Sequence, residues 1–192
     1  MKDHFSKAAA ASAVAILCST AVALAQTSAP AAAASTVVEH PTYVSIPLEM
    51  SVNRPAGEVW KRIGKFCDIG EWLQIPSGCT ITSGKDGEFG AVRSVAGEVL
   101  VGRTELSYTY TQTVRAGRPY NLYHGTLEAR PVTATTSKLV YTLMFDNSML
   151  ADDAAREKDI AQKTAVFTRA LQNMKTLAEG GTLPPPPARG GR

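Results

Sequence analysis

The feature that most constrains the fold is a long amphipathic segment near the C-terminal end. Its core-type positions recur at steps of three and four residues, the spacing of one face of an α-helix. These positions are Ile160, Thr164, Phe167, Leu171, Met174 and Leu177. The opposite face carries charged and amide side chains, which are Lys158, Asp159, Gln162, Lys163, Arg169, Gln172 and Lys175. The segment therefore predicts a long helix, beginning near Asp152 or Asp153, whose carboxylates suit a helix N-terminus.

The preceding residues alternate in the manner of β-strands. Residues 43–52 predict a first strand, in which Pro47 indicates an edge position or a bulge. Pro55 then predicts the start of a helix, with Asn53 as a candidate cap, and a second short helix is expected over residues 68–73. Six further strands are expected at residues 79–82, 89–95, 98–103, 106–114, 123–132 and 138–145.

This order of elements predicts the α+β class. We expect a curved antiparallel sheet of about seven strands wrapped around the long C-terminal helix, with two short helices after the first strand. Such a fold often leaves a cavity between sheet and helix, and a ligand or a substrate would lie there.

The N-terminal residues have the pattern of a targeting signal. Lys2 and Lys7 precede a short, Ala-rich apolar run, and Ala23-Leu24-Ala25 satisfies the small-x-small rule for cleavage. The prediction is a signal peptide over residues 1–25, cleaved after Ala25, and a periplasmic or secreted protein with no membrane span left. A retained membrane anchor is the alternative.

The rest of the chain divides into three parts. Residues 26–40 predict a flexible leader and residues 181–192 a disordered Pro/Gly-rich tail, which leaves a single domain over residues 41–180. The formal net charge is only +3, and the domain has no basic run. Nucleic acid is therefore not an expected partner, and no feature indicates an oligomeric state.

Two cysteines remain after the signal, Cys67 and Cys79. An oxidising compartment and an even count predict a disulfide between them, and Gly70, Pro76 and Gly78 would let the chain double back. Two buried free thiols are the alternative.

The pattern of residues resembles a known superfamily. The stretch Pro55-Ala56-Gly57-Glu58-Val59-Trp60 is followed by Phe66, Cys67, Trp72 and Cys79, and later by Gly90, Arg93, Arg103-Thr104-Glu105-Leu106 and Tyr108-Thr109-Tyr110. Over residues 42–178 the chain is similar to the START-like, polyketide cyclase/dehydrase-like (SRPBCC) superfamily. The resemblance implies its helix-grip fold.

Within that superfamily the chain resembles the branch of the plant abscisic acid receptors, in which two loops close the cavity as gate and latch. By position, the gate would be residues 94–98 and the latch residues 116–119. The chain lacks the longer gate and the His-Arg-Leu latch of those receptors, so the resemblance does not extend to hormone sensing.

Several enzyme classes are excluded by missing motifs. The chain has no Gly-x-Ser-x-Gly elbow, no glycine-rich phosphate loop and no Cys-x-x-Cys pair. Beyond the signal only His40 and His124 remain, too few for a zinc site with the two distant cysteines. No cofactor and no metal is therefore expected.

The candidate cavity residues are aromatic and apolar side chains together with one arginine. Tyrosine hydroxyls on strands would offer hydrogen bonds in an apolar cavity, although each tyrosine could equally be a core or surface ring. Trp60 and Trp72 are interpreted first as core anchors. The candidates are Trp72, Arg93, Tyr108, Tyr110, Tyr123, Tyr141, Phe167, Leu171 and Met174.

Charged residues inside strands leave two alternatives open. Arg93, Arg103 and Glu105 either face solvent or point inward, where a charge needs an anionic ligand or a counter-charge. His124 is a weak candidate for a general base, and Arg93 for a catalytic cation.

Two functions follow as hypotheses, and a structural or interaction role through the convex face of the sheet is a third alternative. The first is an exported protein that binds a hydrophobic or amphipathic small molecule, lipid-like, polyketide-like or aromatic, without catalysis. The second is a cyclase or dehydratase, which requires His124, Arg93 and one tyrosine to converge inside the cavity.

Overall fold

The computed structural model describes residues 38–114, 120 and 122–186. The order of elements is the predicted one, a strand, two short helices, six strands and a long helix. Their bounds are β1 Tyr43–Val52, α1 Ala56–Ile63, α2 Ile69–Trp72, β2 Ile81–Ser83, β3 Val92–Arg93, β4 Glu98–Arg103, β5 Ser107–Gln112, β6 Tyr123–Pro131, β7 Ser137–Asp146 and α3 Asp153–Ala178.

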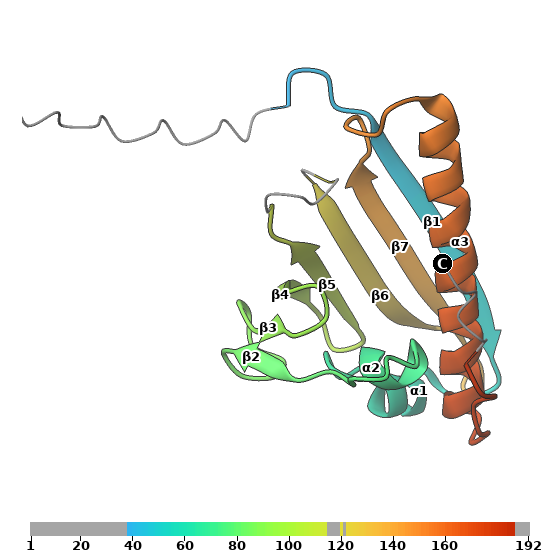
Figure 1. Ribbon diagram of the computed structural model, residues 1–192. Helices are drawn as coiled ribbons and strands as arrows, with labels where there is room; N and C mark the ends of the chain where they lie inside the picture. The colour runs from blue at the N-terminus through green and yellow to red at the C-terminus, as the bar shows by residue number, and fades with distance from the viewer. Residues whose placement is uncertain (1–37, 115–119, 121, 187–192) are drawn as a thin grey trace, which may run out of the picture. The chain divides into compact units, whose positions relative to one another are not determined.

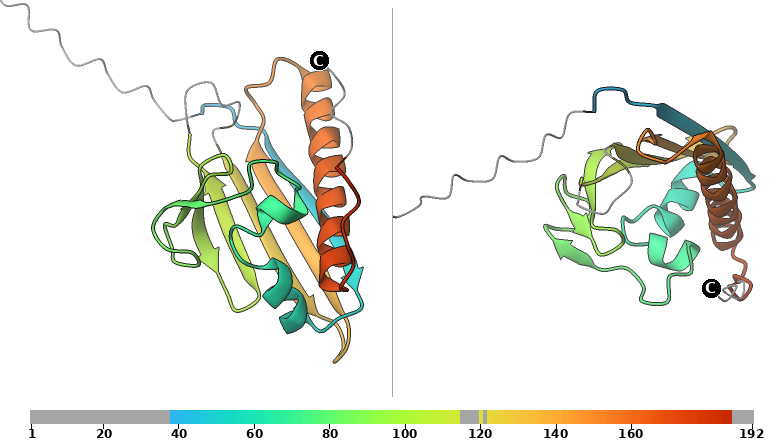
Figure 2. Two further views of the ribbon diagram at one scale, coloured as in Figure 1. Left: turned by 60° about the horizontal axis from the view of Figure 1, so that its bottom comes forward. Right: turned by 45° about the horizontal axis from the view of Figure 1, so that its top comes forward.

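The seven strands form one antiparallel sheet in the order β1-β7-β6-β5-β4-β3-β2. The sheet curves, and α3 lies along its concave side next to β1 and β7 (Figure 1). The helices α1 and α2 close one end of the space between α3 and the sheet (Figure 2). This is the helix-grip fold, as predicted. Pro47 lies on the edge strand β1, where its missing N–H leaves no gap in the sheet interior.

The long helix begins where its acidic residues predict. The side chain of Asp152 caps it by accepting a hydrogen bond from the backbone N–H of Ala155 at 2.7 Å. Its predicted apolar face packs on the sheet, because Phe167, Leu171 and Met174 are all buried. A fourth position, Asn173, is also buried, and its amide donates to the backbone carbonyl of Trp72 at 2.8 Å. This bond ties α3 to the end of α2.

Two local predictions differ from the structure. The strand expected over residues 89–95 is only the two-residue β3, Val92–Arg93. Gly90 has a φ of +82°, so the extended backbone cannot continue from β3 back to Phe89. Phe89 is consequently 67% exposed instead of paired in the sheet. At α1 the N-cap is Pro55, and it makes no side-chain capping bond, so Asn53 does not cap this helix.

The beginning of the C-terminal tail lies against the domain. Leu183 packs against the core, and the side chain of Gln74 donates to the backbone carbonyl of Pro184 at 2.6 Å. The predicted signal peptide and the end of the tail, residues 187–192, lie outside the described residues. Within residues 38–114, 120 and 122–186, no helix is long and apolar enough to cross a membrane.

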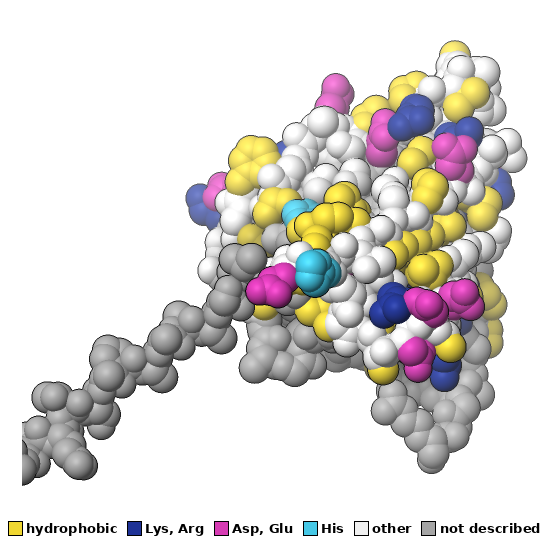
Figure 3. All heavy atoms as spheres, turned by 90° about the horizontal axis from the view of Figure 1, so that it is seen from above, with side chains coloured by type: hydrophobic (Ala, Val, Ile, Leu, Met, Phe, Trp, Pro, Cys, Tyr) yellow, Lys and Arg dark blue, Asp and Glu magenta, His cyan; other side chains and the backbone are white. Residues whose placement is uncertain are grey.

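Large apolar side chains also reach the surface in the described part of the domain. Figure 3 shows one face on which hydrophobic side chains lie among acidic and basic ones. The exposed large apolar residues include Tyr43, Val114, Met144 and Met149. Charged neighbours break up this apolar surface, as is ordinary for a folded domain.

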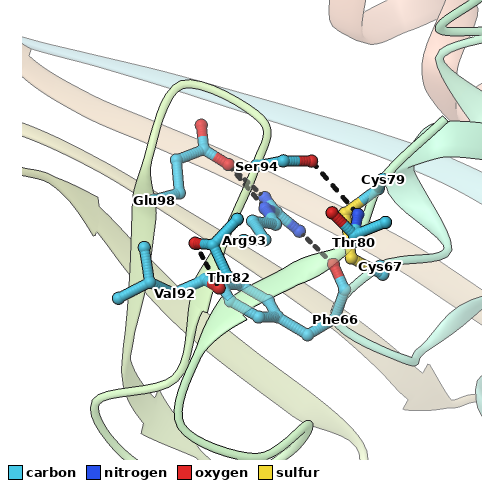
Figure 4. Close-up of a disulfide and its surroundings, with 9 residues drawn as sticks. All are labelled: Phe66, Cys67, Cys79, Thr80, Thr82, Val92, Arg93, Ser94 and Glu98. Carbon is cyan, nitrogen blue, oxygen red and sulfur yellow. Dashed lines mark hydrogen bonds and ion pairs between the residues drawn. A yellow bond between two sulfur atoms is a disulfide. The ribbon is translucent and has the colours of Figure 1, made fainter. Parts of the chain in front are cut away.

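The predicted disulfide is present. Cys67 and Cys79 are bonded, with their Cα atoms 5.2 Å apart, and they join the chain before α2 to the segment that leads into β2 (Figure 4). Gly70 lies against this junction, since a Cβ there would be 2.8 Å from the backbone nitrogen of Cys79. The bond thus holds α2 and its loop against the start of β2.

Removing this disulfide should destabilise the domain. The bond closes a loop with a sequence separation of 12 residues. In the chain-entropy account such a loop is worth roughly 3 kcal/mol, so the Cys67→Ala/Cys79→Ala variant should unfold at lower denaturant concentration by about this free energy. Reduction of the wild-type protein should give the same loss and should not affect the variant. Equal stability of the variant and the oxidised protein would contradict this role.

Candidate functional site

The concave face of the sheet carries a row of tyrosines. The inner positions of β5, β6 and β7 alternate with outer ones, so the four candidate tyrosines lie on the concave face of the sheet. All are buried, with exposed fractions of 3% for Tyr108, 1% for Tyr110, 6% for Tyr123 and 0% for Tyr141. The structure therefore brings these four predicted residues onto one face.

The centre of the grip is occupied by two of these tyrosines. The hydroxyls of Tyr110 and Tyr141 are hydrogen-bonded to each other at 2.9 Å. The ring of Tyr110 lies against Gly125 on the neighbouring strand, where a Cβ would approach the ring and its hydroxyl to 2.4 Å. Burial raises the pKa of both tyrosines well above its usual value, so both hydroxyls stay neutral and can donate and accept.

The other apolar candidates for the cavity, Trp72, Phe167, Leu171 and Met174, belong mostly to the core. The rings of Tyr141 and Phe167 lie 4.7 Å apart, and Trp72 contacts Tyr141 edge to face at 6.2 Å. Leu171 and Met174 are 1% and 0% exposed. These contacts fill the space between the sheet and the middle and C-terminal turns of α3 with side chains.

Arg93 points inward and is fully buried, which decides between the two alternatives left open by the sequence. Its counter-charge is Glu98, whose Oε2 accepts from the Arg93 Nε at 2.7 Å (Figure 4). The two residues are direct cross-strand neighbours of β3 and β4. Arg103 and Glu105, the other two candidate strand charges, are exposed.

The guanidinium of Arg93 is held on several sides. Its Nη1 donates to the backbone carbonyl of Phe66, and its central carbon lies 4.2 Å from the centre of the Phe66 ring and 4.7 Å from that of Tyr110. The amide of Gln112 donates to the other carboxylate oxygen of Glu98 at 3.0 Å. Although burial alone would lower it, the pKa of Arg93 is raised, because Tyr108 and Glu98 interact with the charge. The arginine is therefore a permanent buried cation.

The predicted gate is the tight turn that brings this ion pair together. Ala96 and Gly97 both have positive φ, +53° and +64°, and the N–H of Glu98 bonds the carbonyl of Val95 at 3.1 Å. A short turn of this kind places Arg93 and Glu98 opposite each other. The predicted latch, residues 116–119, lies outside the described residues.

His124 is on the other side of the sheet from Arg93. In β6 the positions of Tyr123 and Gly125 are buried, and His124 between them points to the convex face. Its neighbours there are Thr111 on β5 and the exposed Met144 on β7. Burial lowers the pKa of His124, which favours a neutral imidazole. The convergence of His124, Arg93 and a tyrosine that an enzyme of the expected kind requires is not observed.

An open pocket lies at one end of the grip, between α3 and the ends of β5 and β6. We call it the mouth pocket; its volume is about 280 Å³. It includes two predicted cavity residues, Tyr123 and Phe167. Its lining residues are Gln112, Tyr120, Tyr123, Asp159, Gln162, Lys163, Val166 and Phe167.

An ion pair on α3 forms one wall of the mouth pocket. Lys163 Nζ lies 2.5 Å from the Asp159 carboxylate and 4.3 Å from the centre of the Tyr120 ring. The Tyr120 hydroxyl donates to the same carboxylate oxygen at 2.5 Å. Both charged side chains are mostly buried, at 14% and 16% exposure. Burial, followed by the bond to Asp159, raises the pKa of Tyr120, which keeps its hydroxyl a donor.

Sequence reasoning missed this polar wall as well as Glu98. It placed Asp159 and Lys163 on the solvent-facing side of the helix, where most of the charged residues are. An acidic and a basic residue four positions apart on a helix can form an ion pair, so the pair of Asp159 and Lys163 could have been predicted from the sequence. The partner ring of Tyr120 comes from a distant loop, and no sequence pattern indicates that contact.

Within residues 38–114, 120 and 122–186, no group of three or more His, Cys, Asp or Glu side chains lies close enough together to hold a metal ion.

The curved sheet around α3 defines a helix-grip domain, and the sequence places this domain in the START/SRPBCC superfamily. The sequence profile of the family described as "Polyketide cyclase / dehydrase and lipid transport" matches residues 43–179. The chain therefore belongs to the polyketide cyclase/dehydrase and lipid transport family. A search of curated protein sequences finds no match.

Solved structures share the fold. A protein from Thermobifida fusca has a TM-score of 0.59 and 25% sequence identity, over 71% of this chain and 95% of that one. The ZhuI aromatase/cyclase from a Streptomyces species has a TM-score of 0.54 and 17% identity, over 73% and 100%. A START superfamily protein from Mycobacterium smegmatis has a TM-score of 0.53 and 11% identity, over 70% and 97%. The last two likenesses show the fold alone.

Breaking the buried ion pair should be far more costly than breaking a surface pair. Glu98→Gln leaves the Arg93 charge buried without its carboxylate, a change that typically costs about 3–5 kcal/mol of stability. The matched control is Glu128→Gln, because the pair of Glu128 with Arg130 is exposed and worth about 0–1 kcal/mol. Chemical denaturation measures both. Similar losses for the two variants would show that Arg93 does not depend on Glu98.

Proposed function

We propose that the protein binds a hydrophobic or amphipathic small molecule, lipid-like, polyketide-like or aromatic, that enters the grip through the mouth pocket. The observation that carries the proposal is the composition of this pocket. The rings of Tyr123 and Phe167 and the side chain of Val166 offer apolar contact, and Gln112, Gln162 and the Asp159–Lys163 pair offer polar contact beside them. Apolar walls with a few placed polar groups are typical of small-molecule sites.

The volume of the pocket indicates how the molecule would sit. Ligand pockets usually measure about 300–1,000 Å³, so a pocket of about 280 Å³ accommodates one ring system or a short chain. Beyond it, the bonded pair of Tyr110 and Tyr141 blocks the way toward α2. The apolar end of the molecule would therefore lie against Tyr123 and Phe167, and its polar end near Lys163.

Binding without catalysis is the function that the geometry supports best. The cyclase or dehydratase hypothesis needed a base next to Arg93 and a tyrosine, and His124 lies on the opposite face of the sheet. Arg93 itself is fully buried and already bonded to Glu98 and Phe66. Similarity to the abscisic acid receptor branch stays a prediction.

Blocking the mouth pocket should abolish binding of a neutral hydrophobic probe. Val166 is 42% exposed and lines the pocket, so Val166→Tyr adds a ring at its entrance without disturbing the core. With N-phenyl-1-naphthylamine as a fluorescent probe, this variant should lose at least about tenfold in affinity. Val132→Tyr, at a site 59% exposed in the β6–β7 loop, should bind as the wild type does. Absence of probe binding to the wild type, or unchanged binding to Val166→Tyr, would overturn the proposal.

The proposal includes export, supported by the signal-like N-terminus and by the disulfide, a bond typical of oxidising compartments. The protein purified from the periplasmic fraction or medium of a producing bacterium should begin at Gln26. N-terminal sequencing measures this directly. A cytoplasmic protein that begins at Met1 would contradict export and leave the binding proposal unaffected.

A further inference from the structure

A second pocket, which we call the outer pocket, lies apart from the mouth pocket. It is formed by α1 and the loop after it, the β2–β3 turn and the β4–β5 hairpin, and its volume is about 330 Å³. Ser107, at the first position of β5, lines the outer pocket, whereas Gln112, at the last position of the same strand, lines the mouth pocket. The two pockets have no lining residue in common.

Aromatic rings form the apolar wall of the outer pocket. Tyr108 contacts Trp60 at 5.7 Å and Phe66 at 5.6 Å between ring centres. Phe66 and Tyr108 are buried, whereas Trp60 is only partly buried. Gly64, at the C-terminal end of α1, makes room for the indole, because a Cβ there would lie 2.4 Å from its ring. The backbone thus fixes Trp60 as a partly open aromatic surface beside the pocket.

Basic side chains surround this aromatic wall. Lys61, Lys65 and Arg103 line the pocket, and Asp86 is the one carboxylate among the lining residues. Within residues 38–114, 120 and 122–186, the three cations make no ion pair with a carboxylate. Arg103 is held in place by a bond from its Nη1 to the carbonyl of Gly87. Three cations against one carboxylate give the rim a net positive charge.

We propose that the outer pocket binds a small aromatic anion. The ring would lie against Trp60 and Tyr108, and the anionic group, a carboxylate, sulfonate or phosphate, would face Lys61, Lys65 and Arg103. Apolar aromatic surface next to an excess of cations over carboxylates matches the two ends of such a molecule. This site is additional to the proposed function, since it shares no lining residue with the mouth pocket and its ligand carries a full negative charge.

Two naphthalene probes of nearly equal shape test the charge requirement. The anionic one is 8-anilinonaphthalene-1-sulfonate, and the neutral one is N-phenyl-1-naphthylamine, which lacks the sulfonate. The chain has two tryptophans, so in a Trp72→Phe background Trp60 is the single tryptophan reporter. The anionic probe should quench Trp60 emission to saturation. The variant Lys61→Gln/Lys65→Gln should weaken this binding about tenfold and should leave binding of the neutral probe unchanged.

A matched control removes the same number of charges elsewhere. Arg130→Gln/Lys158→Gln, on exposed positions of β6 and α3, should bind the anionic probe as the wild type does. Equal weakening by both double variants, or no effect of either, would overturn the proposal. Val166→Tyr separates the two sites, because it should block the neutral probe at the mouth and leave quenching of Trp60 by the anionic probe intact. Loss of that quenching in Val166→Tyr would assign the anionic probe to the mouth pocket and also overturn the proposal.

A second measurement does not depend on the tryptophan substitution. Adding the anionic probe to the ¹⁵N-labelled wild-type protein should shift the backbone amide signals of Gly64, Gly87 and Ser107, which line the outer pocket. Shifts confined to Gln112, Gln162 and Lys163 would contradict the assignment.

Discussion

The contact between α3 and the concave face of the sheet is the interaction on which the rest of the structure depends. Phe167 packs on Tyr141 at 4.7 Å, and Asn173 bonds the end of α2 at 2.8 Å, so one helix face holds both the sheet and the short helices. Leu171 and Met174 are excluded from water in the same layer. Where this packing ends, toward the N-terminal half of α3, the mouth pocket opens.

The interior combines this apolar layer with two sets of polar groups that are bonded to each other, a tyrosine pair and an ion pair. Tyr110 bonds Tyr141, and Arg93 bonds Glu98 and the Phe66 carbonyl, so the buried hydroxyl pair and the buried charge have partners inside the protein. A buried cation with its counter-charge in place does not require an anionic ligand. The space for a ligand therefore lies at the open end of the grip, in the mouth pocket, and not at its centre.

Periodicity in the sequence was enough to predict α3 and the order of strands and helices, whereas the expected oxidising compartment and the even cysteine count predicted the disulfide. The two-residue β3 was not predictable as such, because the break depends on the positive φ of Gly90 and not on a loss of alternation. The inward direction of Arg93 could not be predicted from alternation either. Phe89 and Arg93 would face the same side of the expected strand over residues 89–95, yet Phe89 is exposed and Arg93 is buried. Only the register of β3 with β4 reveals Glu98 as its partner. The polar wall of the mouth pocket depends on Tyr120, a contact 39 residues away from Asp159 in the chain.

The proposed ligand binds between the sheet and the N-terminal half of α3. Isotope-filtered nuclear Overhauser measurements on the ¹³C-labelled protein with bound N-phenyl-1-naphthylamine test this binding site most directly. We expect contacts from the protons of the probe to the side chains of Tyr123, Val166 and Phe167, which line the mouth pocket. Contacts to Met144 and His124 on the convex face instead, with none to these three residues, would contradict it.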